Sequence, residues 1–101
     1  MKSTEKETQS ACLQLLEAMG VFHYRQNSGA FKAAHGSFIR FGSPGAPDIV
    51  AVIKGRYIGI EIKDLKAKQN ENQLIFQGRL EKAGGVYIVI RNIDELINFL
   101  K

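Results

Sequence analysis

The chain has 101 residues, 45% hydrophobic and 24% charged, and this length and composition predict one folded domain spanning residues 1–101. Lys and Arg number 14 against 10 Asp and Glu, and the resulting charge of +4 is compatible with a phosphate-bearing partner without requiring one. No apolar run approaches the ~20 residues that cross a bilayer, and the polar start lacks the apolar core of a signal peptide. We therefore expect a cytoplasmic protein with no membrane partner.

Hydrophobic spacing and turn signals divide the chain into helices and strands. The expected elements are a helix at 4–19, strands at 21–26, 38–41, 48–53 and 57–63, a helix at 68–83, a strand at 86–90 and a helix at 93–100. Thr4 and Glu7 have the spacing of a capping box at the first helix. Residues 27–37 are rich in small residues and predict a loop. The order α-β-β-β-β-α-β-α indicates an α/β fold with a central mixed sheet flanked by helices. Residues 86–90 are apolar on both faces, which favours a central strand.

Two acidic residues and one lysine fall on the two neighbouring strands of a predicted hairpin. Asp48 follows Pro47, whose fixed φ marks the entry to a strand. Side chains alternate between the faces of a strand, so Glu61 and Lys63 share a face. A hairpin that closes at residues 54–56 brings Glu61 to the level of Asp48. The sequence thus predicts two carboxylates that face each other at one end of the strand pair.

This grouping points to metal chemistry. Two carboxylates a few ångström apart repel each other, so ionising both is energetically unfavourable without a cation. Their hard oxygen ligands suit Mg²⁺ or Mn²⁺. Such a metal activates water and stabilises charge on a phosphate, and Lys63 has the position to assist. The alternative is a solvated cross-strand pair of Glu61 and Lys63. We favour the site because Glu61 lies among isoleucines and Pro47-Asp48 precedes it.

Pro47-Asp48 followed by Glu61-Ile62-Lys63 resembles the PD-(D/E)XK nuclease pattern, and the sequences GAPDIV at 45–50 and GIEIK at 59–63 resemble its VRR-NUC branch. The resemblance covers nearly the whole chain. It implies a restriction-endonuclease-like core and an endonuclease that depends on Mg²⁺ or Mn²⁺. It also implies that the backbone carbonyl of Ile62 binds the metal beside Asp48 and Glu61.

The resemblance further implies an acidic residue on the first helix and a glutamine on the helix after the catalytic strand. Glu5, Glu7 and Glu17 are candidates for the acid. At about 100° per residue, Glu5 falls on the apolar stripe of Cys12 whereas the other two point away. We therefore favour Glu5 as a metal residue, and Glu7 is the open alternative. A further alternative is that this end of the helix faces solvent and has no role at a metal. Gln73 matches the glutamine. The alternative is that Gln73 has its hydrogen bonds satisfied at the start of its helix and has no role in the site.

The same resemblance implies a substrate. Small stand-alone relatives resemble homodimeric nucleases that cut four-way DNA junctions, so branched DNA and a homodimer are the expected partners, in the host cytoplasm if a phage encodes the chain. Expected DNA-contacting residues are Lys66 and Lys68 after the catalytic strand and Asn27 and Ser28 in the polar loop. Ile93, Ile97 and Phe99 are candidates for a dimer interface, or equally for the core. The alternatives are a non-catalytic DNA-binding module and a defence nuclease on linear duplex DNA.

Overall fold

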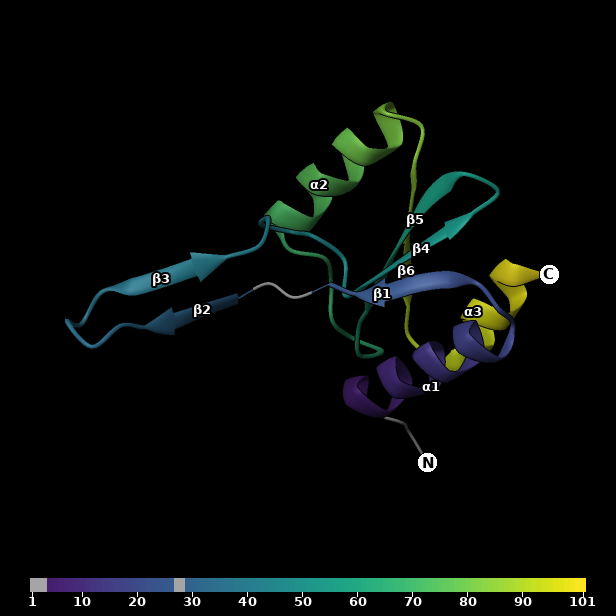
Figure 1. Ribbon diagram of the computed structural model, residues 1–101, viewed down its shortest axis with the longest axis horizontal. Helices are drawn as coiled ribbons and strands as arrows, with labels where there is room; N and C mark the ends of the chain where they lie inside the picture. The colour runs from purple at the N-terminus through teal and green to yellow at the C-terminus, as the bar shows by residue number, and fades with distance from the viewer. Residues whose placement is uncertain (1–3, 27–28) are drawn as a thin grey trace.

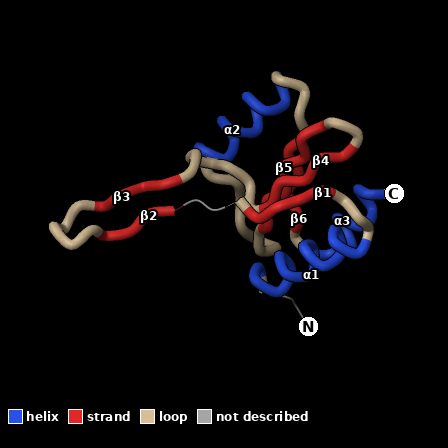
Figure 2. The backbone as a smooth tube through the Cα atoms, in the orientation of Figure 1, coloured by secondary structure: helices blue, strands red, loops and turns tan. Residues whose placement is uncertain are grey.

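A computed structural model describes residues 4–26 and 29–101 (Figures 1 and 2). Asn27 and Ser28, expected to contact DNA, lie outside the described residues. The elements follow in the order α1 (Glu5–Ala18), β1 (Phe22–Arg25), β2 (Gly29–Lys32), β3 (Phe38–Phe41), β4 (Ile49–Ile53), β5 (Arg56–Ile62), α2 (Glu71–Lys82), β6 (Val86–Ile90) and α3 (Ile93–Leu100).

The central sheet has the strand order β1-β4-β5-β6. Strands β1, β4 and β5 are antiparallel neighbours, whereas β5 and β6 are parallel, so the expectation of a mixed sheet is confirmed. The expectation that residues 86–90 form a central strand is wrong, because β6 lies at the edge. Its apolar character has another cause: α2 and α3 both pack against β6 and cover its two faces.

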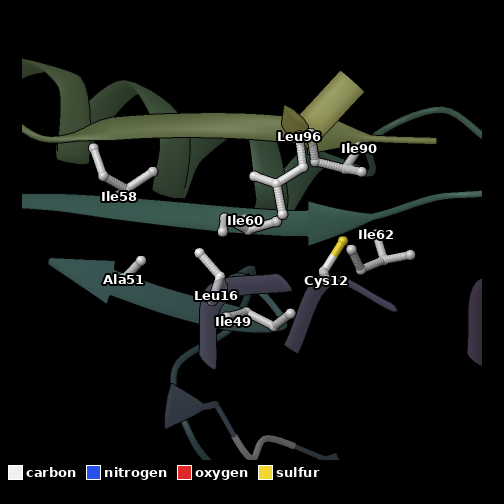
Figure 3. Packing of buried hydrophobic residues seen from close by; sticks show 9 residues of the cluster. All are labelled: Cys12, Leu16, Ile49, Ala51, Ile58, Ile60, Ile62, Ile90 and Leu96. Atoms are coloured by element: carbon white, nitrogen blue, oxygen red, sulfur yellow. The ribbon is translucent and has the colours of Figure 1, made fainter. Parts of the chain in front are cut away.

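The helices form a layer on each side of the sheet, with α1 and α3 on one side and α2 on the other (Figure 1). The hydrophobic core lies between the sheet and the α1–α3 layer, where Cys12 and Leu16 of α1 are fully buried. Figure 3 shows these side chains among those of the sheet. The buried cluster comprises Cys12, Leu16, Ile49, Ala51, Ile58, Ile60, Ile62, Ile90 and Leu96.

The predicted loop at 27–37 is wrong in part, because β2 lies within it. Strands β2 and β3 pair as a separate two-stranded antiparallel sheet, which projects away from the central sheet (Figure 2). The small residues mark the hairpin turn rather than a long loop: the N–H of Ala33 donates to the carbonyl of Ser37 (2.7 Å), and Gly36 has the left-handed φ of 92° that glycine tolerates. The described part of the chain therefore has one strand more before α2 than predicted.

Side-chain caps set where two of the helices begin. Thr4 caps α1 and forms the expected capping box with Glu7. The second helix begins at Glu71 rather than at residue 68, because the Asn70 side chain accepts from the N–H of Gln73 and ends the preceding loop. In the part of the chain that is described, no helix is long and apolar enough to cross a membrane.

Candidate active site

The two predicted carboxylates meet at one end of the β4–β5 pair. Ile49 pairs with Ile60 in antiparallel register, so Asp48, one residue before Ile49, comes level with Glu61, one residue after Ile60. The backbone N–H of Ile62 donates to Oδ2 of Asp48 (2.8 Å). This bond fixes the Asp48 carboxylate against the end of β5.

The Gly-Pro turn before Asp48 is clamped between β5 and α2. Gly45 has a φ of +80°, and a Cβ built on it would lie 2.1 Å from the carbonyl oxygen of Asn72 at the start of α2. A Cβ on Gly59 would lie 2.8 Å from Cγ of the buried Pro47. Glycine is thus required at both positions for close approach, and the clamped turn places Asp48.

Glu61 is a buried carboxylate, only 5% exposed. Its Oε2 accepts from Nε2 of Gln73 (2.9 Å) and lies 3.9 Å from Nζ of Lys63. Its Oε1 is buried and has no hydrogen-bond partner among the described residues. Burial, and then the negative charge of Asp48, raises the pKa of Glu61 to about 7. A buried acceptor without a partner is rare in folded proteins and requires an explanation.

Gln73 joins the start of α2 to Glu61. Its Oε1 accepts from the N–H of Asn70 (3.0 Å), and its own N–H donates to Oδ1 of Asn70 (2.9 Å). These two bonds form a capping box and fix the amide so that its NH₂ group points at Glu61. The helix start therefore holds one carboxylate oxygen and leaves the other available.

Charges of both signs surround Asp48, which is half-buried. Burial raises the pKa of Asp48, and the negative charge of Glu5 adds to this. The N–H bond from Ile62 and the positive charges of Lys63 and Arg25 lower the pKa of Asp48. Arg25 was not predicted as a site residue; its signal in the sequence is only its place at the end of the strand that pairs with β4.

Two of the three candidate acids of α1, Glu5 and Glu7, have different partners. Oε1 of Glu5 accepts from the N–H of Asp64 (2.9 Å), just beyond the end of β5. Oε1 of Glu7 instead accepts from the N–H of Thr4 in the exposed capping box (3.1 Å). Of these two, Glu5 is the one whose charge raises the pKa of Glu61. Its role toward a metal stays a prediction.

The remaining predicted residues lie in different surroundings. Lys66 and Lys68 are exposed in the loop after β5. Arg91 ties this loop to the end of β6, because its Nη1 donates to the carbonyls of Asp64 and of Ala67. Of the interface candidates, Ile97 and Phe99 are partly exposed, whereas Ile93 packs against the core.

Tyr87 is a neighbour of the site that the sequence analysis missed. It is 4% exposed, and its hydroxyl donates to the carbonyl of Gly45 (3.3 Å) in the clamped turn. Burial, and then the charge of Glu61, raises the pKa of Tyr87. Strand register is the feature that could have indicated this position, because Tyr87 pairs with Gly59, which shares a face with Glu61.

The donor set fits a hard divalent cation. The buried Oε1 of Glu61, which has no partner among the described residues, is the oxygen that such a cation would bind, and Asp48 would supply a second carboxylate. Within 4–26 and 29–101, no three His, Cys, Asp or Glu side chains gather closely enough to hold a metal. A site on Asp48 and Glu61 therefore needs a ligand of another kind, such as the backbone carbonyl of Ile62 that the sequence resemblance implies.

The fold is thus the α/β, restriction-endonuclease-like arrangement expected from the sequence. A search of solved structures matches a protein described as "VRR_NUC domain", with a TM-score of 0.69 and 21% sequence identity. The match covers 97% of this chain and 96% of that one. No family model matches the chain, and no curated protein matches it. The structural match establishes that the chain has the fold of a VRR-NUC domain.

Proposed function

We propose that this protein is a metal-dependent nuclease that hydrolyses phosphodiester bonds in branched DNA. The observation that carries the proposal is the buried Oε1 of Glu61, which has no partner in the described residues and lies beside a second carboxylate. Burying an unpaired acceptor is energetically unfavourable, and a cation bound to this oxygen would offset that free energy. The shared fold with a protein described as a VRR_NUC domain supports this proposal.

Each residue of the candidate site has a separate role in this proposal. Asp48, Glu61 and the carbonyl of Ile62 would hold Mg²⁺ or Mn²⁺, which when bound supplies an activated water and a Lewis acid for the phosphate. Gln73 orients Glu61. The Lys63 ammonium, 3.9 Å from Glu61, offers positive charge to the phosphate or to the attacking water. Glu5 contributes negative charge at the edge of the metal site.

Branched DNA is the favoured substrate, with a four-way junction first. The net charge of +4 and the exposed Lys66 and Lys68 after the catalytic strand favour phosphate contacts. One copy of the chain carries one such site. Symmetrical cutting of two strands therefore requires a two-fold dimer, and we propose that the active form is a homodimer.

Cleavage assays on matched substrates test this function. Wild type and Glu61→Gln are incubated with a four-way junction, a flap and a linear duplex of equal length, in Mg²⁺, Mn²⁺ or EDTA. We expect wild type to cut the branched substrates in Mg²⁺ or Mn²⁺ only, and Glu61→Gln to cut none. Junction binding without any metal-dependent cutting would instead indicate a non-catalytic DNA-binding module. Preferential cutting of linear duplex would indicate a defence nuclease.

Sedimentation of the free protein tests the dimer separately. A homodimer gives a mass near twice the 11.2 kDa of the chain at the concentrations used for cleavage. A monomer at those concentrations that still cuts both junction strands in one binding event would contradict the dimer and leave the nuclease in place.

A further inference from the structure

Half of one sheet face carries exposed aromatic residues. Helix α2 packs over β6, whereas β1, at the opposite edge of the sheet, packs closely only against β4 and α1 among the described elements. Helix α1 lies on the other face of the sheet (Figure 1). On the open half, Phe22 is 67% exposed, Tyr24 47% and Val52 36%. Exposed aromatic groups that lie together mark an interaction surface.

These aromatic side chains form a continuous group. Phe22 and Tyr24 are two residues apart on β1, with ring centroids 6.4 Å apart. Register places Phe22 opposite Val52 and Val52 opposite Tyr57. The charge of Tyr24 contributes to raising the pKa of Tyr57, after burial of that hydroxyl, so the two phenols lie near each other. We call Phe22, Tyr24, Val52 and Tyr57 the open face.

The open face leads to the candidate active site. Strand β1 ends at Arg25, and β4, its antiparallel partner, begins one residue after Asp48. Tyr57 and Glu61 lie on the same side of β5, because both are odd-numbered positions of one strand. A strand of nucleic acid that passes over Phe22 and Tyr24 toward the end of β1 therefore approaches the carboxylates within a few nucleotides.

The segment of chain that carries Phe22 and Tyr24, together with the β2–β3 hairpin that follows it, has a charge that favours a polyanion. Residues 18–47 contain no Asp or Glu, but contain Arg25, Lys32 and Arg40. The positive charge of Arg25 reaches Asp48, whose pKa it lowers. A second copy packed on this face would bring two such basic segments together and repel, whereas nucleic acid would be attracted.

We propose that the open face binds an unpaired segment of the nucleic acid substrate, with bases stacked on Phe22 and Tyr24. This inference rests on the proposed function and adds to it. Bases in a duplex already stack on their neighbours, so only unpaired bases offer a free face to an aromatic ring, and stacking of this kind tolerates any base. The substrate therefore includes unpaired bases near the scissile phosphate, such as those that open at the branch point of a four-way junction or those of a flap.

Binding measured without metal separates this proposal from catalysis. Fluorescence anisotropy in EDTA compares labelled oligothymidylate with a duplex of equal length, for wild type, the double variant Phe22→Ala/Tyr24→Ala, and Met19→Ala. Met19 is the control for loss of an exposed apolar side chain, because it is 51% exposed at the C-terminal end of α1, on the other side of the sheet. We expect the double variant to lose roughly 10- to 100-fold in affinity for the single strand, and less than about threefold for the duplex. Met19→Ala and Tyr24→Phe keep wild-type affinity.

The outcomes are distinct. Equal loss on single strand and duplex, or no loss at all in a variant with a wild-type circular dichroism spectrum, would overturn the stacking proposal. A double variant that binds single strand as wild type does but changes from dimer to monomer would assign the open face to a second copy. Loss of single-strand binding in the double variant, together with no cutting of any substrate by wild type, would support single-strand binding by the open face and contradict the proposed nuclease activity.

Discussion

The two sides of β5 carry residues that are equally buried and chemically opposite. Ile60 is 1% exposed and Ile62 3%, whereas Glu61 between them is 5% exposed. The isoleucines pack into the apolar cluster against α1 and α3, and Glu61 points to the side of α2. Burial alone therefore does not separate structural from functional positions; the partners of each side chain do.

The two sides also act on stability with opposite signs. On the isoleucine side, each apolar group removed from water stabilises the fold. On the other side, a carboxylate out of water destabilises its own charged form, which raises the pKa of Glu61 to about 7. The apolar side thus provides the stability that lets the fold hold an unfavourable charge at the candidate site.

The largest expected effect comes from substituting adjacent residues on these two sides. Glu61→Gln should lower metal-dependent cleavage by roughly 1,000-fold or more, because a catalytic metal supplies several kcal/mol of transition-state stabilisation. Its free energy of unfolding at pH 8 should equal or exceed that of wild type. Ile60→Ala should do the reverse, losing about 2–5 kcal/mol of stability while the folded fraction still cuts.

Urea unfolding and single-turnover cleavage at low temperature measure both quantities for the same preparations. If Ile60→Ala lost activity per folded molecule as completely as Glu61→Gln, the separation between the two sides of β5 would not hold.

The next effect is a dependence of stability on pH that comes from Glu61. A folded-state pKa of about 7 against 4.5 in the unfolded chain means that the native state binds more protons between these values. The free energy of unfolding of the metal-free protein should therefore fall by roughly 3 kcal/mol as pH rises from about 4.5 to about 7, and then level off. Subtracting the curve of Glu61→Gln isolates this contribution.

Metal should oppose this fall, because it binds the ionised carboxylates of the native state. We expect Mg²⁺ to raise the Tm of wild type clearly at pH 8, little at pH 5, and not at all in Glu61→Gln. Parallel pH curves for wild type and Glu61→Gln in EDTA would show that Glu61 titrates as an ordinary carboxyl.

Gln73 provides a smaller test on the helix that covers this side. Gln73→Ala removes the bond to Glu61 and the bond to the N–H of Asn70, so metal affinity and cleavage should fall about 10- to 100-fold. Gln77→Ala is the matched control one turn further along α2, where, among the described residues, Gln77 bonds to Gln69 and Glu81. Calorimetric Mg²⁺ titration of both variants measures the affinity. Equal losses in both would mean that the effect comes from α2 as a whole.

Local patterns predicted much of this structure. The facing of Asp48 and Glu61 followed from a short hairpin, because 13 residues of chain leave only a few registers open. The cap at Thr4 and Glu7 involves four consecutive residues and was confirmed for the same reason. The contact of Gln73 with Glu61 was expected only as a buried polar residue in need of a partner.

Features that depend on distant parts of the chain could not be predicted this way. The apolar strand β6 lies at the sheet edge, and its place there depends on its pairing with the distant strand β5, in which Ile58 lies opposite Val86. Tyr87 and Arg25 come near the carboxylates through strand pairing, and nothing in their sequence neighbours indicates it. The small residues around Gly36 have the composition of a loop, although they form the turn of a hairpin.

The smallest expected effect distinguishes the two acids at the start of α1, which lie two residues apart and point in different directions. Glu5 contacts the N–H of Asp64 beside the site, so Glu5→Gln should weaken Mg²⁺-dependent cleavage about 10-fold, as loss of a residue around a metal site commonly does. Glu7 forms the capping box of α1 with Thr4. Glu7→Gln should therefore leave cleavage unchanged and cost at most about 1 kcal/mol of stability. Cleavage rates across a Mg²⁺ titration compare the two, and a larger loss in Glu7→Gln would assign the acid of the first helix to Glu7.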